Sequence, residues 1–201
     1  MSEDIKLFDR WDLSNVEVDD PGLKDYINVE PVLVPNKSHG RHAANQFNKS
    51  DVNIVERLIN KLQNPGHRGK KHKISSGMCG GNVETATKIV KKTLEIVEDK
   101  LDKNPVKVLV DAIENSALME EVSSYQIGSI IARKAVITSP QRRVDLSLRH
   151  MIQGAYSQSL NSNKNMEDCL ANEILAAYND SNDSFAIRQK DKSEREAAGA
   201  R

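Results

Sequence analysis

The sequence predicts a mainly α fold: a bundle of about six helices with a protruding β-hairpin and an extended N-terminal arm. Three observations lead to this prediction. Apolar residues recur at helical spacing in six segments, most of which follow a residue that commonly caps helices. Residues 120–138 are instead rich in Val and Ile and contain a Gly-Ser pair. Residues 1–36 contain three prolines and show no helical pattern.

The length of 201 residues suits one well-buried domain. The sequence contains no repeat of 20–50 residues and no clear linker. We therefore expect an extended acidic arm over residues 1–36 and a single helical domain over residues 37–201, with the β-hairpin at about 120–138. Phe8 and Trp11 are the side chains expected to anchor the arm to this domain.

The first helix is expected over residues 52–63, where apolar side chains recur every three or four positions. Ser50 or Asp51 would cap its start, and an Asn-Pro-Gly sequence ends it. Arg57 and Lys61 lie one turn apart, off the apolar stripe. We therefore expect both side chains to project together into solvent. A long glycine-rich loop follows up to residue 82.

The later helices begin at similar signals. Asn82 and Asn165 are expected N-caps, with Asp168 at the capping-box position after Asn165. Asn104 and Ser139 are each followed by a proline, which the first turn of a helix tolerates. The expected helices cover residues 52–63, 83–101, 105–118, 140–157 and 166–178, with a sixth that begins near 184.

The hairpin is expected to have strands near Val122–Ile127 and Ile131–Thr138, joined at Gly128-Ser129. Arg133 and Lys134 are placed near its tip. A two-stranded ribbon is only marginally stable alone in water. A projecting basic hairpin is therefore suited to contact with a partner, although an ordinary surface hairpin remains an alternative.

Charge is distributed unevenly along a chain whose 29 basic and 29 acidic residues cancel. Residues 1–30 carry three basic and nine acidic side chains, whereas residues 37–73 carry nine basic and two acidic ones. Charges act within about 8 Å at physiological salt, so the local excess matters more than the total. The basic stretch also holds four of the five histidines and favours a polyanion such as a phosphate backbone.

Enzymatic and metal-binding patterns fit poorly. The basic loop Gly66–Lys71 lacks the spacing of a nucleotide-binding P-loop, and its short Gly-x-x-Gly string is a weak match to KH modules. The histidines and Cys79 have no zinc-ligand spacing. We predict no catalytic site, metal or cofactor. The acidic N-terminus and the absence of an apolar run of about 20 residues predict a cytoplasmic protein without a membrane partner.

Six short sequence strings, which occur in a fixed order along the chain and are given below, resemble the family of small-subunit ribosomal protein seven in its archaeal and eukaryotic form. A hairpin before the Ser-Pro-x-Arg-Arg string completes the pattern. The strings are Ser38-His39-Gly40-Arg41, Val52 to Leu62 (containing Ile-Val-Glu-Arg-Leu), Asn104-Pro105, Ser139-Pro140-Gln141-Arg142-Arg143, Cys169-Leu170-Ala171-Asn172-Glu173 and Ser184-Phe185-Ala186-Ile187.

The resemblance implies a structural component of the small ribosomal subunit. Such proteins bind the 3′ major domain of small-subunit rRNA, organise assembly of the head with other head proteins, and lie near the exit-site tRNA and the mRNA exit channel. A free RNA-binding regulator or chaperone is the alternative. By position, the hairpin residues nearest tRNA and mRNA would be Arg133 and Lys134. The implied rRNA-binding residues are Arg41, Lys49, Arg57, Lys61, Arg68, Lys70, Lys71, Arg142, Arg143 and Arg149.

Overall fold

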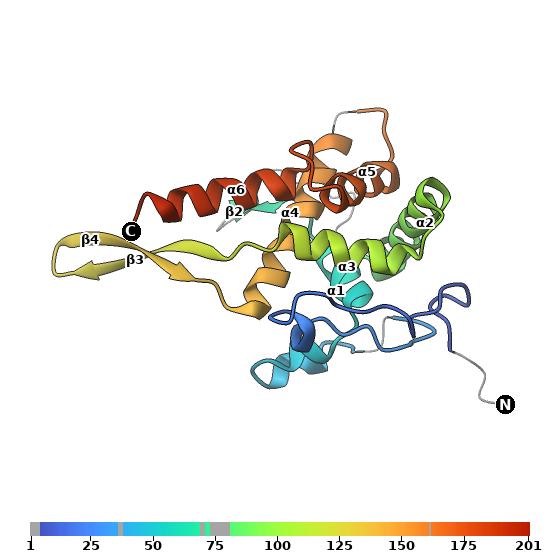
Figure 1. The fold of residues 1–201 in the computed structure, drawn as a ribbon. Coiled ribbons are helices and arrows are strands. Elements are labelled where there is room, and N and C mark those ends of the chain that lie inside the picture. The colour runs from blue at the N-terminus through green and yellow to red at the C-terminus, as the bar shows by residue number, and fades with distance from the viewer. Residues whose placement is uncertain (1–4, 36–37, 69–70, 73–80, 161) are drawn as a thin grey trace.

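The computed structural model describes residues 5–35, 38–68, 71–72, 81–160 and 162–201 (Figure 1). Six α-helices and a protruding β-hairpin occupy this part of the chain, which confirms the mainly α prediction. None of the described helices combines the length and the apolar character needed to cross a membrane. The helices are α1 (Ile54–Leu62), α2 (Val83–Leu101), α3 (Pro105–Ser116), α4 (Pro140–Ser159), α5 (Met166–Tyr178) and α6 (Phe185–Ala198).

The helices other than α1 begin within about one residue of the expected positions, but only some of the expected capping residues make capping hydrogen bonds. Asn82 and Asn104 accept backbone hydrogen bonds as expected, and Ser184 accepts two. Helix α1 begins two residues late, because Asn53 rather than Ser50 or Asp51 is its cap and accepts from the Val55 N–H at 2.9 Å. Residues 48–51 form a 3-10 turn instead. The expected caps of α4 and α5 make no side-chain capping bond.

Helix α5 packs against α2, α3 and α4, and so lies at the centre of the bundle. The core here includes Leu94, Leu109, Leu148 and Ile174, all inaccessible to solvent. Helix α1 joins the same core through its contacts with α2 and α4. This arrangement places α1 and α4 side by side, and their shared surface carries the basic residues considered below.

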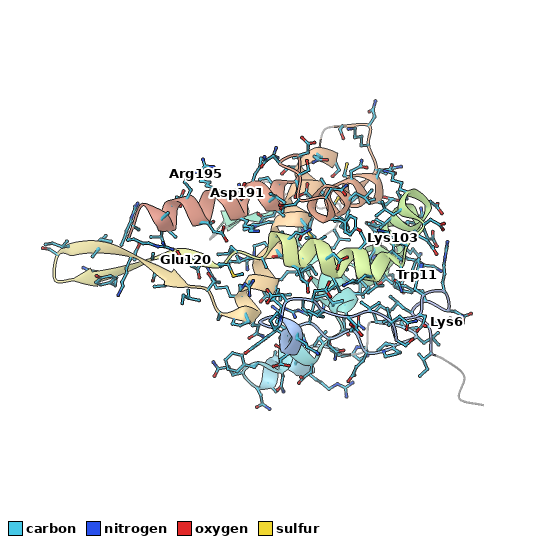
Figure 2. All side chains as sticks on the ribbon, in the orientation of Figure 1. Lys6, Trp11, Lys103, Glu120, Asp191 and Arg195 are labelled. Atoms are coloured by element: carbon cyan, nitrogen blue, oxygen red, sulfur yellow. The ribbon has the colours of Figure 1, made fainter. Side chains whose placement is uncertain are left out.

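The N-terminal segment is irregular in backbone, with one short 3-10 turn at Lys24–Tyr26, but it is part of the core. Figure 1 shows it running along the side of the bundle formed by α1 and α3. Trp11, labelled in Figure 2, is 3% exposed and donates from Nε1 to Glu98 Oε2 of α2 at 3.0 Å. Leu7, Leu13, Val16, Leu23 and Ile27 are buried in the same cluster. The boundary at residue 36 stays a prediction.

The hairpin consists of β3 (Glu120–Ile127) and β4 (Ile130–Ile137), and its register ends in the pair Ile127–Ile130. The turn is Gly128-Ser129, where Gly128 has φ of +60°. Arg133 pairs with Ser124 and Lys134 with Ser123, which places both halfway along the ribbon. The expected position near the tip was therefore wrong, because the ladder extends up to the two turn residues.

A second, two-residue ladder lies where the sequence predicts only a loop. Strand β1 (His67–Arg68) pairs antiparallel with β2 (Lys71–His72). Lys70 and the side chains of Arg68 and Lys71 lie outside the described residues, so their predicted RNA contacts stay predictions.

Candidate nucleic-acid interface

Four basic side chains and one carboxylate form a cluster around Lys61 where α1 meets α4. Lys49 comes from the 3-10 turn before α1, Arg57 and Lys61 from α1, and Arg149 from α4. Asp145 of α4 accepts from Lys49 Nζ at 2.7 Å through one oxygen and from Arg57 Nη2 at 3.3 Å through the other. All four cations are among the rRNA-binding residues expected from the sequence, but nothing in the sequence identifies Asp145 as the acid that pairs with two of them.

Arg57 does not project into solvent, contrary to the sequence-based expectation. Its side chain is 1% exposed, and Nη1 donates to the backbone oxygen of Tyr26 at 2.7 Å. The periodicity of α1 shows one apolar stripe, but the N-terminal segment covers the opposite side, so all residues from Ile54 to Ile59 are buried. Arg57 thus links the backbone at Tyr26 to Asp145 of α4.

Lys61 lies in an environment with excess positive charge. Burial lowers its pKa, and Lys49, Arg149 and Arg57 lower it further, while Asp145 opposes them. Burial alone would raise the pKa of Asp145, but Lys49, Lys61 and Arg57 bring it below its ordinary value. The carboxylate is therefore ionised near neutral pH and still leaves the cluster positive. A phosphate oxygen would relieve the repulsion around Lys61.

A hollow of about 350 Å³ opens beside this cluster, between the C-terminal end of α1 and the middle of α4. Lys61 and Arg149 supply its positive charge, and three side-chain amides and two apolar side chains complete it. Its lining residues are Asn60, Lys61, Asn64, Pro65, Arg149, Ile152 and Gln153.

The two arginines at the start of α4 are held by acids from other segments. Arg143 has a side chain that is 7% exposed and donates from Nη2 to Asp20 Oδ2 at 2.9 Å. Arg142 binds both carboxylate oxygens of Glu121, at 2.6 and 2.7 Å, and stays half exposed. The sequence suggests a phosphate as compensation for cations at this helix N-terminus. In the structure Asp20 and Glu121 supply that compensation.

The remaining predicted residues do not join the α1–α4 cluster as one site. Arg41 is exposed in the 3-10 turn Arg41–Ala44 and donates from Nε to Ser38 O at 3.3 Å. Arg133 and Lys134 are exposed on the hairpin, and adjacent strand positions face opposite sides. Arg133 lies in a groove between the hairpin and α6, next to Arg195, which Figure 2 labels.

One group of carboxylates has a spacing that would suit a cation. Ligand oxygens of Asp19, Asp111 and Glu114 lie within 4.8 Å of one another. Lys107 Nζ lies 2.8 Å from Asp19 and 3.0 Å from Asp111, and Glu114 accepts the backbone N–H groups of Asp19 and Asp20. A lysine thus already supplies the positive charge, and these contacts fasten the N-terminal segment to α3.

Comparisons with known proteins identify the family. The family model for ribosomal protein S7p/S5e matches residues 23–201. Small ribosomal subunit protein uS7 of Nanoarchaeum equitans is 47% identical over 197 residues, covering 98% of this chain and 99% of that protein. The uS7 protein of Methanococcoides burtonii is 45% identical, with coverage of 98% and 99%. That of Archaeoglobus fulgidus is 44% identical, with coverage of 99% and 96%. The chain therefore belongs to the ribosomal protein S7p/S5e family, whose members are structural, rRNA-binding proteins of the small ribosomal subunit and not enzymes.

Proposed function

We propose that this protein is built into the small subunit of the cytoplasmic ribosome, where it binds the 3′ major domain of the rRNA and organises assembly of the head. Its partners are the rRNA and neighbouring head proteins, with the exit-site tRNA and the mRNA close to the hairpin. Family membership over nearly the whole chain supports the ribosomal setting. The exposed hairpin, which protrudes from the bundle in Figure 1, supports a contact beyond the main binding surface.

The observation that carries rRNA binding is the surplus of positive charge between α1 and α4. Lys49, Arg57 and Lys61 act together on one ionised carboxylate, Asp145, and Arg149 acts on Lys61. Such a surplus costs stability in the free protein, because like charges repel at short range. Folded RNA offers phosphates at many angles and is recognised largely through shape and backbone contacts. Lys61 and Arg149, at the surface hollow, are the two cations that reach solvent there.

Replacing Lys61 and Arg149 together with Gln tests this proposal. Each lost phosphate contact reduces the magnitude of the slope of log affinity against log salt by about 0.7–0.9. The slope of the double variant should therefore be smaller in magnitude by about 1.4–1.8 than that of the wild type. The measurement is binding of labelled small-subunit rRNA over a salt series. The matched control is Lys88→Gln with Lys91→Gln, two exposed lysines of α2, which should leave the slope unchanged. An unchanged slope for Lys61→Gln/Arg149→Gln would contradict the proposal.

Sedimentation separates the ribosomal role from a free RNA-binding regulator or chaperone. In a gradient of cell lysate at low salt, the protein should migrate with the small subunit. A protein found only at the top of the gradient would favour the alternative.

A further inference from the structure

We infer that the hollow between α1 and α4 receives one unpaired nucleotide of RNA, with its phosphate at Lys61 and Arg149 and its base between the two helices. The inference rests on the proposed rRNA binding and deepens it, because it assigns a ligand class to one place on the surface. A double-helical segment cannot fill this site, since its bases are paired and stacked inside the duplex.

The size of the hollow is the first argument. Its volume of about 350 Å³ is at the lower end of the range of about 300–1,000 Å³ found for small-molecule pockets. A phosphate group alone would leave most of this space unfilled. A nucleotide combines a compact anion with a flat, largely apolar ring. The lining of the hollow offers a partner for each part: Lys61 and Arg149 are cationic, whereas Pro65 and Ile152 are buried and apolar.

The amides are the second argument. Asn60 lies in the last turn of α1 and Asn64 follows its C-cap, four positions later, and both are exposed. Gln153 of α4 completes the set from the other side. Each side-chain amide offers a donor and an acceptor, which is the combination that an unpaired base edge presents. Gln63 Nε2 donates to Asn60 Oδ1 at 3.3 Å, which helps to orient that amide.

The dipole of helix α1 is the third argument. The C-terminal end of a helix carries a partial negative charge, which disfavours a bare anion. Asn60, Asn64 and Pro65 all lie at this end of α1. Lys61, in the last turn of α1, and Arg149 of α4 must therefore offset this partial charge for the phosphate, and the part of the ligand that faces the unpaired carbonyls of the helix end must be uncharged and offer a donor. An unpaired base, which is uncharged and carries a ring N–H or an amino group, meets this requirement.

The test compares two double variants of the full chain on two RNA probes. The probes are a fluorescein-labelled 12-nucleotide uridine oligomer and a labelled 12-base-pair RNA duplex, measured by anisotropy at one salt concentration. Asn60→Ala with Asn64→Ala should bind the single strand about fivefold to tenfold more weakly, because one or two hydrogen bonds are lost. Its duplex affinity should change less than twofold. Lys61→Gln with Arg149→Gln should weaken binding to both probes.

Controls keep the outcomes separate. Asn163→Ala with Asn182→Ala removes two exposed amides outside the hollow and should leave both affinities unchanged. Thermal melting verifies that each variant is folded. If the Asn60/Asn64 variant binds the single strand like wild type, or loses affinity equally for both probes, the nucleotide site is overturned. In that case, a loss of affinity in the Lys61/Arg149 variant still supports rRNA binding at the α1–α4 surface. If neither variant affects either probe, both the site and the proposed α1–α4 surface fail.

Discussion

Asp145 holds together two segments that are distant in the sequence, and its replacement by Asn is the most informative perturbation. The carboxylate binds Lys49 at 2.7 Å and Arg57 at 3.3 Å, and the side chain of Arg57 is 1% exposed. Asn can still accept one hydrogen bond, but the buried guanidinium loses its counter-charge. Removing one partner of a buried ion pair costs about 3–5 kcal/mol. Because Asp145 itself is 20% exposed and solvated, we expect about 3 kcal/mol.

The assay is urea unfolding at pH 7, followed by circular dichroism, alongside thermal melting. For a chain of this size, each kcal/mol lowers the Tm by about 2–4 °C, so Asp145→Asn should lower it by about 6–12 °C. The exposed Asp99 of α2 provides the control, since Asp99→Asn should change the free energy of unfolding by less than about 0.5 kcal/mol. RNA affinity at low salt should rise with Asp145→Asn, because the cluster gains one net positive charge.

The pH dependence follows from the lowered pKa of Asp145. A carboxylate with a lowered pKa in the folded state stabilises the protein above its unfolded pKa, here 3.8, and this contribution is lost as the pH falls through the folded value. The difference between wild type and Asp145→Asn should therefore be constant from pH 5 to pH 7 and shrink below about pH 4. Equal unfolding free energies at pH 7, or a fall in RNA affinity together with the fall in stability, would refute the reasoning.

Three further predictions concern other parts of the molecule. Gly154→Ala should cost about 1–3 kcal/mol in a denaturation experiment, because its Cβ would lie 2.6 Å from Phe185 Cβ. Glu173→Gln should raise the urea midpoint at pH 7, because burial raises the pKa of this carboxyl, and the gain should vanish below about pH 4.5, where the wild-type group is neutral. Arg133→Ala with Lys134→Ala should leave affinity for isolated rRNA nearly unchanged and impair exit-site tRNA binding to assembled subunits; an equal loss of rRNA affinity would count against the hairpin role.

The helices could be predicted from the sequence because their signals are local. Apolar spacing and the caps Asn82 and Asn104 lie within one or two turns of the backbone that they organise. The hairpin was also predictable, but the position of Arg133 and Lys134 along it depends on the full register, which the sequence pattern does not settle.

The environment of the basic residues could not be predicted in the same way, because it depends on distant partners. Arg143 meets an acid 123 residues away, and Arg57 meets one 88 residues away. A helical stripe indicates which side of α1 faces the bundle, but it carries no information about the N-terminal segment that covers the other side. The cations could be identified as a group, whereas their division into solvent-exposed residues and buried, ion-paired residues required the fold.

The burial of the N-terminal segment has a consequence for how the chain folds while it is being made. Trp11 donates to Glu98 of α2, but Asp20 accepts from Arg143 of α4, so the N-terminal segment meets its last partner only after α4 has begun to emerge. At about 5–20 residues per second, the 123 residues that separate Asp20 from Arg143 take about 6–25 s to translate. During that interval the core that Leu7, Trp11 and Leu23 enter lacks the apolar side chains of α4. The N-terminal segment thus reaches its full set of contacts only after α4 has emerged.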